Sequence, residues 1–214
     1  MLTGRLVLPL NNYREPAPRL AFIERLLGEL KAKPGVTFVG INTAMPVSGS
    51  GDNNATTVEG HVPQPGESIQ AHYTAGSSGE YWQAMGVPLR EGRFLEDADN
   101  HRDQRVCIVD ENFAKRYWPN GGALGRRISN DPVFKEAEAF TIVGVVGRVK
   151  HNELGDAVAQ GAVYYPYRYY ASSGFFLVVQ ATGAAEPSLP GAYSWIGRSR
   201  AKVSRPCPLF QRAT

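Results

Sequence analysis

The sequence contains little cysteine and no long apolar run, and its first residues do not have the pattern of a signal peptide. Its two cysteines, Cys107 and Cys207, are too few for a disulfide framework and lack metal-ligand spacing, although one bridge between them remains open. Cys107 lies inside the apolar run VCIV, which predicts a small buried side chain. No stretch approaches the roughly 18 uninterrupted apolar residues of a membrane helix. Because the start, MLTGRLVLPL, also lacks the features of a signal peptide, we expect a soluble chain or a soluble piece of a longer protein.

An excess of charge of one sign is also missing. The chain has 23 Lys and Arg against 20 Asp and Glu, and residues 183–214 hold five basic residues with Glu186 as their only acid. The rest of the chain is therefore close to neutral. Since a nucleic-acid interface needs basic side chains gathered on one face, we expect no nucleic-acid partner.

Sequence motifs of catalysis and nucleotide binding are absent. There is no G-x-x-x-x-G-K followed by Ser or Thr, so ATP hydrolysis by this chain is not predicted. Gly144 and Gly147 follow a strand-like run but do not complete G-x-G-x-x-G. No serine stands in G-x-S-x-G, and neither cysteine has a neighbouring histidine. The sequence predicts neither an enzyme nor a bound cofactor.

The titratable residues do not form recognisable sites. The four histidines lack metal-ligand spacing, which favours solvated or capping roles; they are His61, His72, His101 and His151. The acidic group Glu96, Asp97 and Asp99 follows GRF and predicts a turn. Asp110 and Glu111 predict the start of a helix.

Residues 1–46 follow the order strand, helix, strand. LTGRLVL predicts the first strand, and VTFVGINTAM predicts the second. Between them, Leu20, Ile23, Leu27 and Leu30 recur at helical spacing, and Pro34 with Gly35 ends the pattern. The loop SGSGDNNA that follows predicts a boundary, after which shorter strands and turns begin.

The alternating stretch SIQAHYTA predicts a half-buried strand, with Ile69, Ala71 and Tyr73 on one face. Beyond it, Ser77 and Glu80 have the spacing of a capping box for a short helix. That helix would place its aromatic residues Tyr81 and Trp82 in a core.

Residues 105–150 predict a strand, a helix and a second strand. VCIV and FTIVGVV are the strands, and Asp110 is the expected N-cap of the helix between them. Phe113, Tyr117 and Trp118 are expected to pack from that helix. Gly144 and Gly147 are expected to be positions of close packing in the second strand.

The run VYYPYRYY, from Val163 to Tyr170, allows two interpretations. Tyr and Arg are enriched at interfaces, so Tyr164, Tyr165, Tyr167 and Arg168 are the candidate partner-binding residues. Strand alternation equally places Tyr164 and Tyr165 on opposite faces, with at least one of them in the core.

Several phrases, in this order, resemble a known family: LTGRLVLP, FIERLLGELKAKPGV, AMPVSGSG, TTVEG, PGESIQAHYTAGSSGEYWQAMGVPLREGRFLEDAD, VCIVDENFAKRYWPNGGALGRRI, FTIVGVVGRVKHNEL and VYYPY. Together they cover residues 1 to about 182. They are similar to the extracytoplasmic, MacB-like periplasmic core domain of MacB/FtsX-type ABC transporter permeases, and most closely to the duplicated-permease branch described in acidobacteria. The segment GAYSWIGRSRAKVSRPC departs from the helix that the family has near its end.

The resemblance implies an α+β fold of two subdomains. Residues 1–46 and 162–214 would form a porter-like βαβ layer, and residues 47–161 an inserted mixed α/β subdomain of the kind called Sabre. It further implies a non-catalytic domain on the periplasmic side of the cell membrane that transmits conformational change during transport or efflux. The implied partners are the permease's own transmembrane helices, indirectly a cytoplasmic ATPase, and a periplasmic adaptor or substrate protein. No cofactor and no catalytic residue is implied.

A second function also stays open at this point. Clefts between subdomains are common ligand sites, so the chain is alternatively a stand-alone periplasmic module that binds a small molecule in such a cleft. Saturable thermal stabilisation by a small solute would favour this alternative.

Overall fold

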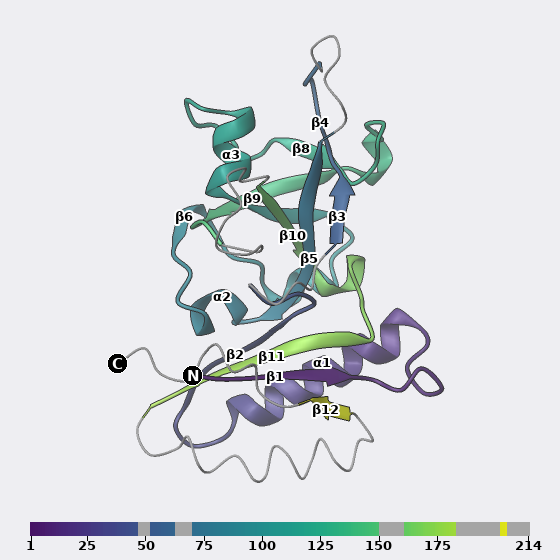
Figure 1. The fold of residues 1–214 in the computed structure, drawn as a ribbon, viewed down its shortest axis with the longest axis vertical. Helices are drawn as coiled ribbons and strands as arrows, with labels where there is room; N and C mark the ends of the chain where they lie inside the picture. The colour runs from purple at the N-terminus through teal and green to yellow at the C-terminus, as the bar shows by residue number, and fades with distance from the viewer. Residues whose placement is uncertain (47–51, 63–69, 150–160, 183–201, 205–214) are drawn as a thin grey trace.

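The computed structural model describes residues 1–46, 52–62, 70–149, 161–182 and 202–204. Figure 1 shows two parts, a layer that holds the first and last described strands and a larger body stacked on it. We call these the terminal layer (α1, β1, β2, β11 and β12) and the inserted body (β3 to β10, α2, α3 and the 3-10 helices). The expectations for Cys207, for His151 and for most of the segment after residue 182 lie outside the described residues.

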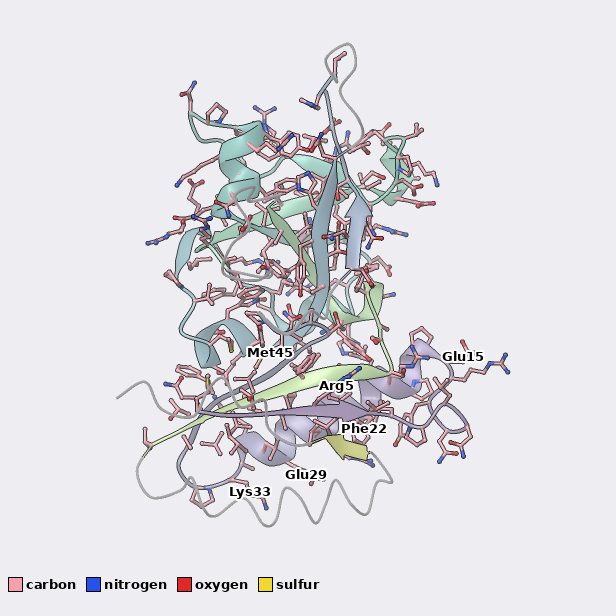
Figure 2. All side chains as sticks on the ribbon, in the orientation of Figure 1. Arg5, Glu15, Phe22, Glu29, Lys33 and Met45 are labelled. Carbon is pink, nitrogen blue, oxygen red and sulfur yellow. The ribbon has the colours of Figure 1, made fainter. Side chains whose placement is uncertain are left out.

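The terminal layer is an antiparallel sheet in the order β12-β1-β11-β2 with one helix on it. α1 begins with Pro16, which suits a first helical turn because proline lacks the N–H that would be unpaired there. The helix buries an apolar stripe on the sheet, while Glu29 and Lys33 face solvent (Figure 2). The elements are β1 (Leu2–Val7), α1 (Pro16–Lys31), β2 (Val36–Asn42), β11 (Gly174–Ala181) and β12 (Lys202–Ser204).

The predicted strand, helix and strand of residues 1–46 are confirmed. Ile23, Leu27 and Leu30 are buried as expected, and they share a core with Leu6, Phe175 and Leu177 of the sheet and with Leu8, which follows β1. Burying a side chain of this size stabilises the fold by about 1.5–3 kcal/mol. Leu20 only reaches the edge of this core.

The inserted body continues the same hydrogen-bonded sheet, in the order β2-β5-β10-β7-β9-β8-β4, with β3 on β5 and β6 on β9. β10 is parallel to β5, and β7 is parallel to β9, so the sheet is mixed. The fold class is therefore α+β, as predicted. The elements are β3 (Asp52–Ala55), β4 (Thr57–Val58), β5 (Ala71–Gly79), α2 (Tyr81–Ala84), β6 (Leu89–Gly92), η1 (Asp97–Asn100), β7 (Val106–Asp110), α3 (Glu111–Tyr117), β8 (Arg127–Ser129), η2 (Glu136–Glu138), β9 (Phe140–Val146), β10 (Ala162–Pro166) and η3 (Tyr167–Tyr169).

The strand, helix and strand predicted for residues 105–150 are β7, α3 and β9. Asp110 caps α3, since its Oδ1 accepts a hydrogen bond of 2.9 Å from Phe113 N–H. The same oxygen accepts 2.9 Å from Ala162 N–H at the start of β10. One carboxylate thus satisfies two buried backbone donors from distant parts of the chain.

Gly144 and Gly147 are positions of close packing, as expected. A Cβ on Gly144 would lie 2.0 Å from the carbonyl oxygen of Arg93, and a Cβ on Gly147 would lie 2.8 Å from Cγ of Pro88. Both contacts are with the segment of β6 and its flanks, which pairs antiparallel with β9. The two glycines therefore let β6 approach β9.

Two local predictions are wrong. Asp52–Ala55, expected in a loop, forms β3 because its backbone pairs with Ala71–Thr74 of β5. Ser77, expected as an N-cap, lies inside β5; Glu80 is the N-cap residue of α2, and it makes no side-chain capping bond. The long strand forms because β10 pairs along Tyr73–Ser77, and this pairing overrides the local capping pattern.

The predicted boundary at residue 162, where the second half of the porter-like subdomain would begin, coincides with the start of β10. The neighbours of β10 are β5 and β7 of the inserted body, while β11 pairs with the terminal strands. The division into two separate subdomains stays a prediction, because one sheet runs through both parts.

Candidate functional site

The candidate site is the junction between the two parts. β2 leaves the terminal layer and pairs with the end of β5 through three residue pairs, Gly40 with Gly79, Ile41 with Ser78 and Asn42 with Ser77. α2 follows β5 directly and lies against β2. This short ladder carries the sheet from one part into the other.

Two glycines make the junction possible. A Cβ on Gly40 would lie 2.2 Å from the backbone nitrogen of Tyr81 and 2.5 Å from its Cα. Gly79 has φ +68°, and a Cβ there would lie 2.8 Å from the carbonyl oxygen of Val39. Side chains essentially never approach backbone this closely, so β2 and the start of α2 touch backbone to backbone.

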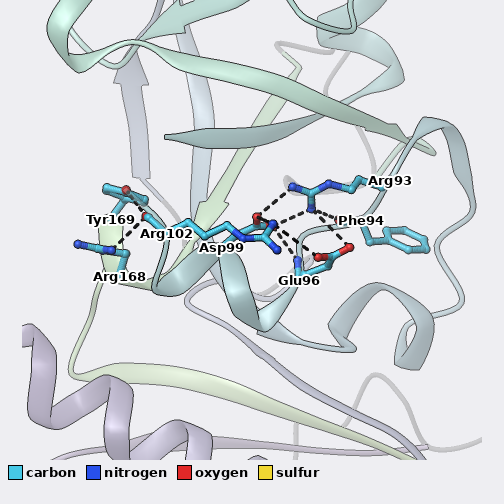
Figure 3. Close-up of polar contacts among 7 residues, drawn as sticks. All are labelled: Arg93, Phe94, Glu96, Asp99, Arg102, Arg168 and Tyr169. Carbon is cyan, nitrogen blue, oxygen red and sulfur yellow. Dashed lines mark hydrogen bonds and ion pairs between the residues drawn. The ribbon is translucent and has the colours of Figure 1, made fainter. Parts of the chain in front are cut away.

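A polar cluster beside the junction fixes the segment between β6 and β7 (Figure 3). Arg93 donates two hydrogen bonds to the Asp99 carboxylate, at 2.8 and 2.9 Å, and Glu96 N–H donates a third at 2.8 Å. The side chain of Asp99 is only 1% exposed. Burial opposes its ionisation, but the bonds from Arg93 and Glu96 outweigh burial, so the pKa of Asp99 is lowered.

The same segment is tied to β5 and to η3. Asn100 donates through Nδ2 to Ser78 Oγ at 3.2 Å, and its Oδ1 accepts 3.1 Å from Arg168 N–H. Asp97 accepts 3.0 Å from Gly79 N–H at the junction itself. Arg168 in turn donates to the carbonyl oxygen of Arg102 at 3.2 Å. The polar cluster therefore braces the body side of the junction.

Two polar side-chain contacts cross from α1 to the inserted body. Glu24 pairs with His101, and Lys31 pairs with Glu80, the residue that immediately precedes α2. All four side chains are at least one third exposed. A groove of about 500 Å³ lies at this side of the junction; Glu24, Lys31, Glu80 and Asp97 contribute to its walls, and Leu27 and Val39 also line it.

The candidate partner-binding tyrosines are core residues. Tyr164, Tyr165 and Tyr167 are at most 1% exposed, which contradicts a role as surface contacts. Strand alternation sends Tyr164 into the core with Trp82 and Tyr165 into the core with Phe113, because both faces of β10 are covered. Of the four predicted residues only Arg168 is exposed, and its role in partner binding stays a prediction.

The remaining titratable residues do not assemble into a reactive site. His72, expected in solvent, is buried and its Nε2 is 2.8 Å from the Tyr117 hydroxyl. Burial raises the pKa of the Cys107 thiol, which keeps it in the unreactive protonated form. Burial also raises the pKa of Asp110, against the opposing effect of its backbone donors. Within the described residues no group of three or more His, Cys, Asp or Glu side chains is placed to hold a metal ion.

The sequence did not reveal the junction. Gly40 and Gly79 lie in β2 and at the end of β5, and only the contacts of α2 show why glycine is needed there. The spacing of Glu96 and Asp99, three residues apart, is the one local signal of the polar cluster, since those two residues form a capping box around η1.

Comparison with known proteins identifies the fold and the family. The family of MacB-like periplasmic core domains matches residues 11–189. No curated protein matches the chain. No helix in the described ranges is long and apolar enough to cross a membrane.

Solved structures of related domains superpose on nearly the whole chain. The periplasmic region of MacB from Actinobacillus actinomycetemcomitans has a TM-score of 0.59 at 17% identity, covering 96% of this chain and 89% of that one. The extracellular domain of the noncanonic ABC-type transporter YknZ from Gram-positive bacteria has a TM-score of 0.57 at 15% identity, covering 95% and 100%. A domain of a putative permease from Porphyromonas gingivalis has a TM-score of 0.52 at 17% identity, covering 95% and 87%. The chain belongs to the family of MacB-like periplasmic core domains, the extracytoplasmic domains of ABC transporter permeases.

Proposed function

We propose that this domain transmits conformational change between the membrane helices of its permease and a partner or substrate on the extracytoplasmic side, without catalysing a reaction. The observation that carries the proposal is the narrow junction. The terminal layer holds both the first and the last described strands, and its sheet continues into the inserted body through only three residue pairs of β2 and β5. Movement imposed on the terminal layer would therefore reach the body through this short ladder and through the apolar contacts that Phe176 and Val178 of β11 make with the body.

The surface contacts at the junction suit repeated movement. An exposed ion pair such as Lys31 with Glu80 contributes about 0–1 kcal/mol, so this pair, and the exposed contact of Glu24 with His101, can break and re-form at little cost. The body side is more rigid, because Asp99 and Asn100 hold η1 through buried hydrogen bonds. The proposed movement is thus a change of angle between two stiff parts.

The test measures distances in the intact permease. Spin labels at Glu29 in α1 and Arg126 in the inserted body span the junction, whereas labels at Arg90 and Arg126 lie within the body and serve as the control. Cys207 is replaced by serine, and Cys107 stays because it is buried. We expect nucleotide-dependent change in the distance that spans the junction and none in the control. Identical distances in the nucleotide-free, ATP-bound and ADP-bound states would refute the proposal.

Transmission also requires the junction to be free to move. A short thiol cross-linker between cysteines at positions 24 and 101 would hold α1 to the inserted body. A matched pair at positions 59 and 127 joins the residue after β4 to β8 within the body, where Glu59 and Arg127 already form an ion pair. We expect the first cross-link, and not the second, to uncouple ATP hydrolysis from transport.

A further inference from the structure

A second hollow lies between the two parts and is separate from the groove at α1. It encloses about 260 Å³, which is smaller than the roughly 300–1,000 Å³ of sites for drug-sized ligands. Its polar lining includes Arg5, Thr43, Asp52, Tyr170 and Ser172. The terminal layer supplies Arg5, while the inserted body supplies Asp52, so the hollow has one wall from each part.

The acidic wall is held by a network of hydrogen bonds. Tyr170 donates from its hydroxyl to Asp52 Oδ2 at 2.8 Å, and it accepts 2.8 Å from Asn54 Nδ2. Asn54 also donates to Thr74 Oγ1 at 2.6 Å, and Thr74 is 1% exposed. Burial raises the pKa of Tyr170, and the nearby Asp52 raises it further, so the hydroxyl stays protonated and continues to donate. The Asp52 carboxylate is therefore fixed in direction, and its other oxygen accepts no hydrogen bond from the described residues.

The basic wall is a single arginine. Arg5 lies opposite Phe176 in the register of β1 and β11, and its guanidinium carbon is 5.9 Å from the centre of that ring. Leu6, its neighbour in sequence, faces α1, so Arg5 faces the inserted body (Figure 2). Among the described residues no carboxylate pairs with Arg5.

Hydroxyl groups line the hollow between these charges. Thr43 Oγ1 accepts 2.9 Å from Gly76 N–H, and Ser172 Oγ accepts 3.2 Å from Gly174 N–H. Because each oxygen already accepts a backbone hydrogen bond, each hydroxyl proton is left to be donated. The hollow thus presents a cation, an anion and two further donors.

We infer that this hollow binds a small zwitterion, with the ligand carboxylate on Arg5 and the ligand ammonium on Asp52. Opposite charges on facing walls, neither of which has an ionic partner among the described residues, are complementary to a molecule that carries both charges. A guanidinium offers two parallel donors to a carboxylate, and charge-assisted bonds of this kind are about twice as strong as neutral ones. The volume suits a compound the size of one amino acid. This inference does not depend on the transmission role, although a bound ligand would bridge the two parts.

The probes are zwitterions of increasing charge separation: glycine, β-alanine, γ-aminobutyrate and glycylglycine. N-acetylglycine and glycinamide keep only one of the two charges and are the matched controls. Calorimetric titration of the 214-residue chain is expected to show one binding site. One member of the charge-separation series should bind at least about tenfold tighter than either single-charge compound, because both charged walls are then engaged.

The variants separate the two walls. Arg5→Gln and Asp52→Asn preserve shape and are each expected to weaken binding at least about tenfold, since one charge-assisted contact is lost. Arg5→Lys keeps the cation but loses the two parallel donors, so it is expected to bind more weakly than the native chain and more tightly than Arg5→Gln. Arg126→Gln removes an exposed arginine outside the hollow and is expected to change nothing.

Thermal unfolding and circular dichroism confirm that each variant is folded before titration. Absence of measurable binding by any zwitterion at millimolar concentration would overturn the inference. So would equal affinity for N-acetylglycine or glycinamide, or binding that both Arg5→Gln and Asp52→Asn leave unchanged.

Discussion

Replacing Gly40 with alanine adds one methyl group at the junction, where it should force α2 of the inserted body away from β2 of the terminal layer. In Gly40→Ala the new Cβ would lie 2.2 Å from the nitrogen and 2.5 Å from the Cα of Tyr81. Ordinary van der Waals contact begins near 3.4 Å, so the start of α2 must move away from β2 by about 1 Å. Backbone cannot rotate aside as a flexible side chain can. Overpacking costs about 1–3 kcal/mol where side chains can adjust, so we expect a loss of about 3 kcal/mol here.

Urea unfolding measures this loss, and Gly28→Ala provides the control. Gly28 lies in α1, is exposed, and a Cβ there would meet nothing within 4 Å. Alanine in an exposed helix interior stabilises by about 0.5–1 kcal/mol relative to glycine. The same substitution should therefore have opposite signs at two positions of one chain, destabilising at Gly40 and stabilising at Gly28.

The result that would refute this reasoning is a Gly40→Ala protein within about 0.5 kcal/mol of the native chain, the range of an ordinary surface substitution. It would mean that α2 and β2 are not in backbone contact. The junction would then consist of the β2–β5 ladder without the close contact of α2.

Three further predictions concern buried side chains. Trp82→Ala should lower the free energy of unfolding by about 3–5 kcal/mol, because the indole ring is buried and its centre lies 4.5 Å from the centre of the Tyr164 ring. An unchanged thermal midpoint would show that the Trp82 ring is not in the core. Asp99→Asn should cost about 2 kcal/mol at pH 7 in urea unfolding, less than the roughly 3–5 kcal/mol for a fully buried pair, because Arg93 is 35% exposed. The folded pKa of Asp99 is lowered, so the carboxylate stabilises the fold above its ordinary pKa, and this stabilisation is lost as pH falls through the folded pKa. A stability cost of Asp99→Asn that increases at acidic pH would contradict this prediction. The folded pKa of Asp110 is raised, so its protonation stabilises the fold below the ordinary pKa, and this stabilisation is lost as pH rises through the folded value. Asp110→Asn keeps the capping oxygen and does not ionise, so its stability relative to the native chain should increase as pH rises. A difference in unfolding midpoint between variant and native chain that does not change with pH would count against this prediction.

Local patterns predicted the elements whose environment is simple. α1 has a clean apolar stripe against one sheet, so Ile23, Leu27 and Leu30 could be assigned to a core from spacing alone. Asp110 could be assigned as a cap because an N-cap acts within one turn of its own helix. In both cases the forces that decide the structure act between residues close in sequence.

The elements that failed are decided by distant partners. β5 is buried on both faces, so His72 and Thr74, which alternate with Tyr73, are covered as well, His72 by Tyr117 and Thr74 by Tyr170. Tyr117 lies in α3 and Tyr170 lies beyond β10, so no pattern within residues 71–79 could predict these contacts. The tyrosines of β10 failed as surface candidates for the same reason. Side chains that satisfy a buried hydroxyl or fill a core look the same in sequence as side chains that meet a partner.

The pairing of β1 with β11 also governs the order in which the chain can fold. β1 ends at Val7, and its partner β11 begins at Gly174, so the sheet beneath α1 is incomplete until most of the chain has been made. Until then the apolar stripe of α1 lacks Phe175 and Leu177, two residues of its core. Apolar surface that waits for a distant strand is exposed to aggregation and slows folding. The inserted body, whose strands all lie between these two, is free to form first and to bring the ends of the terminal layer together.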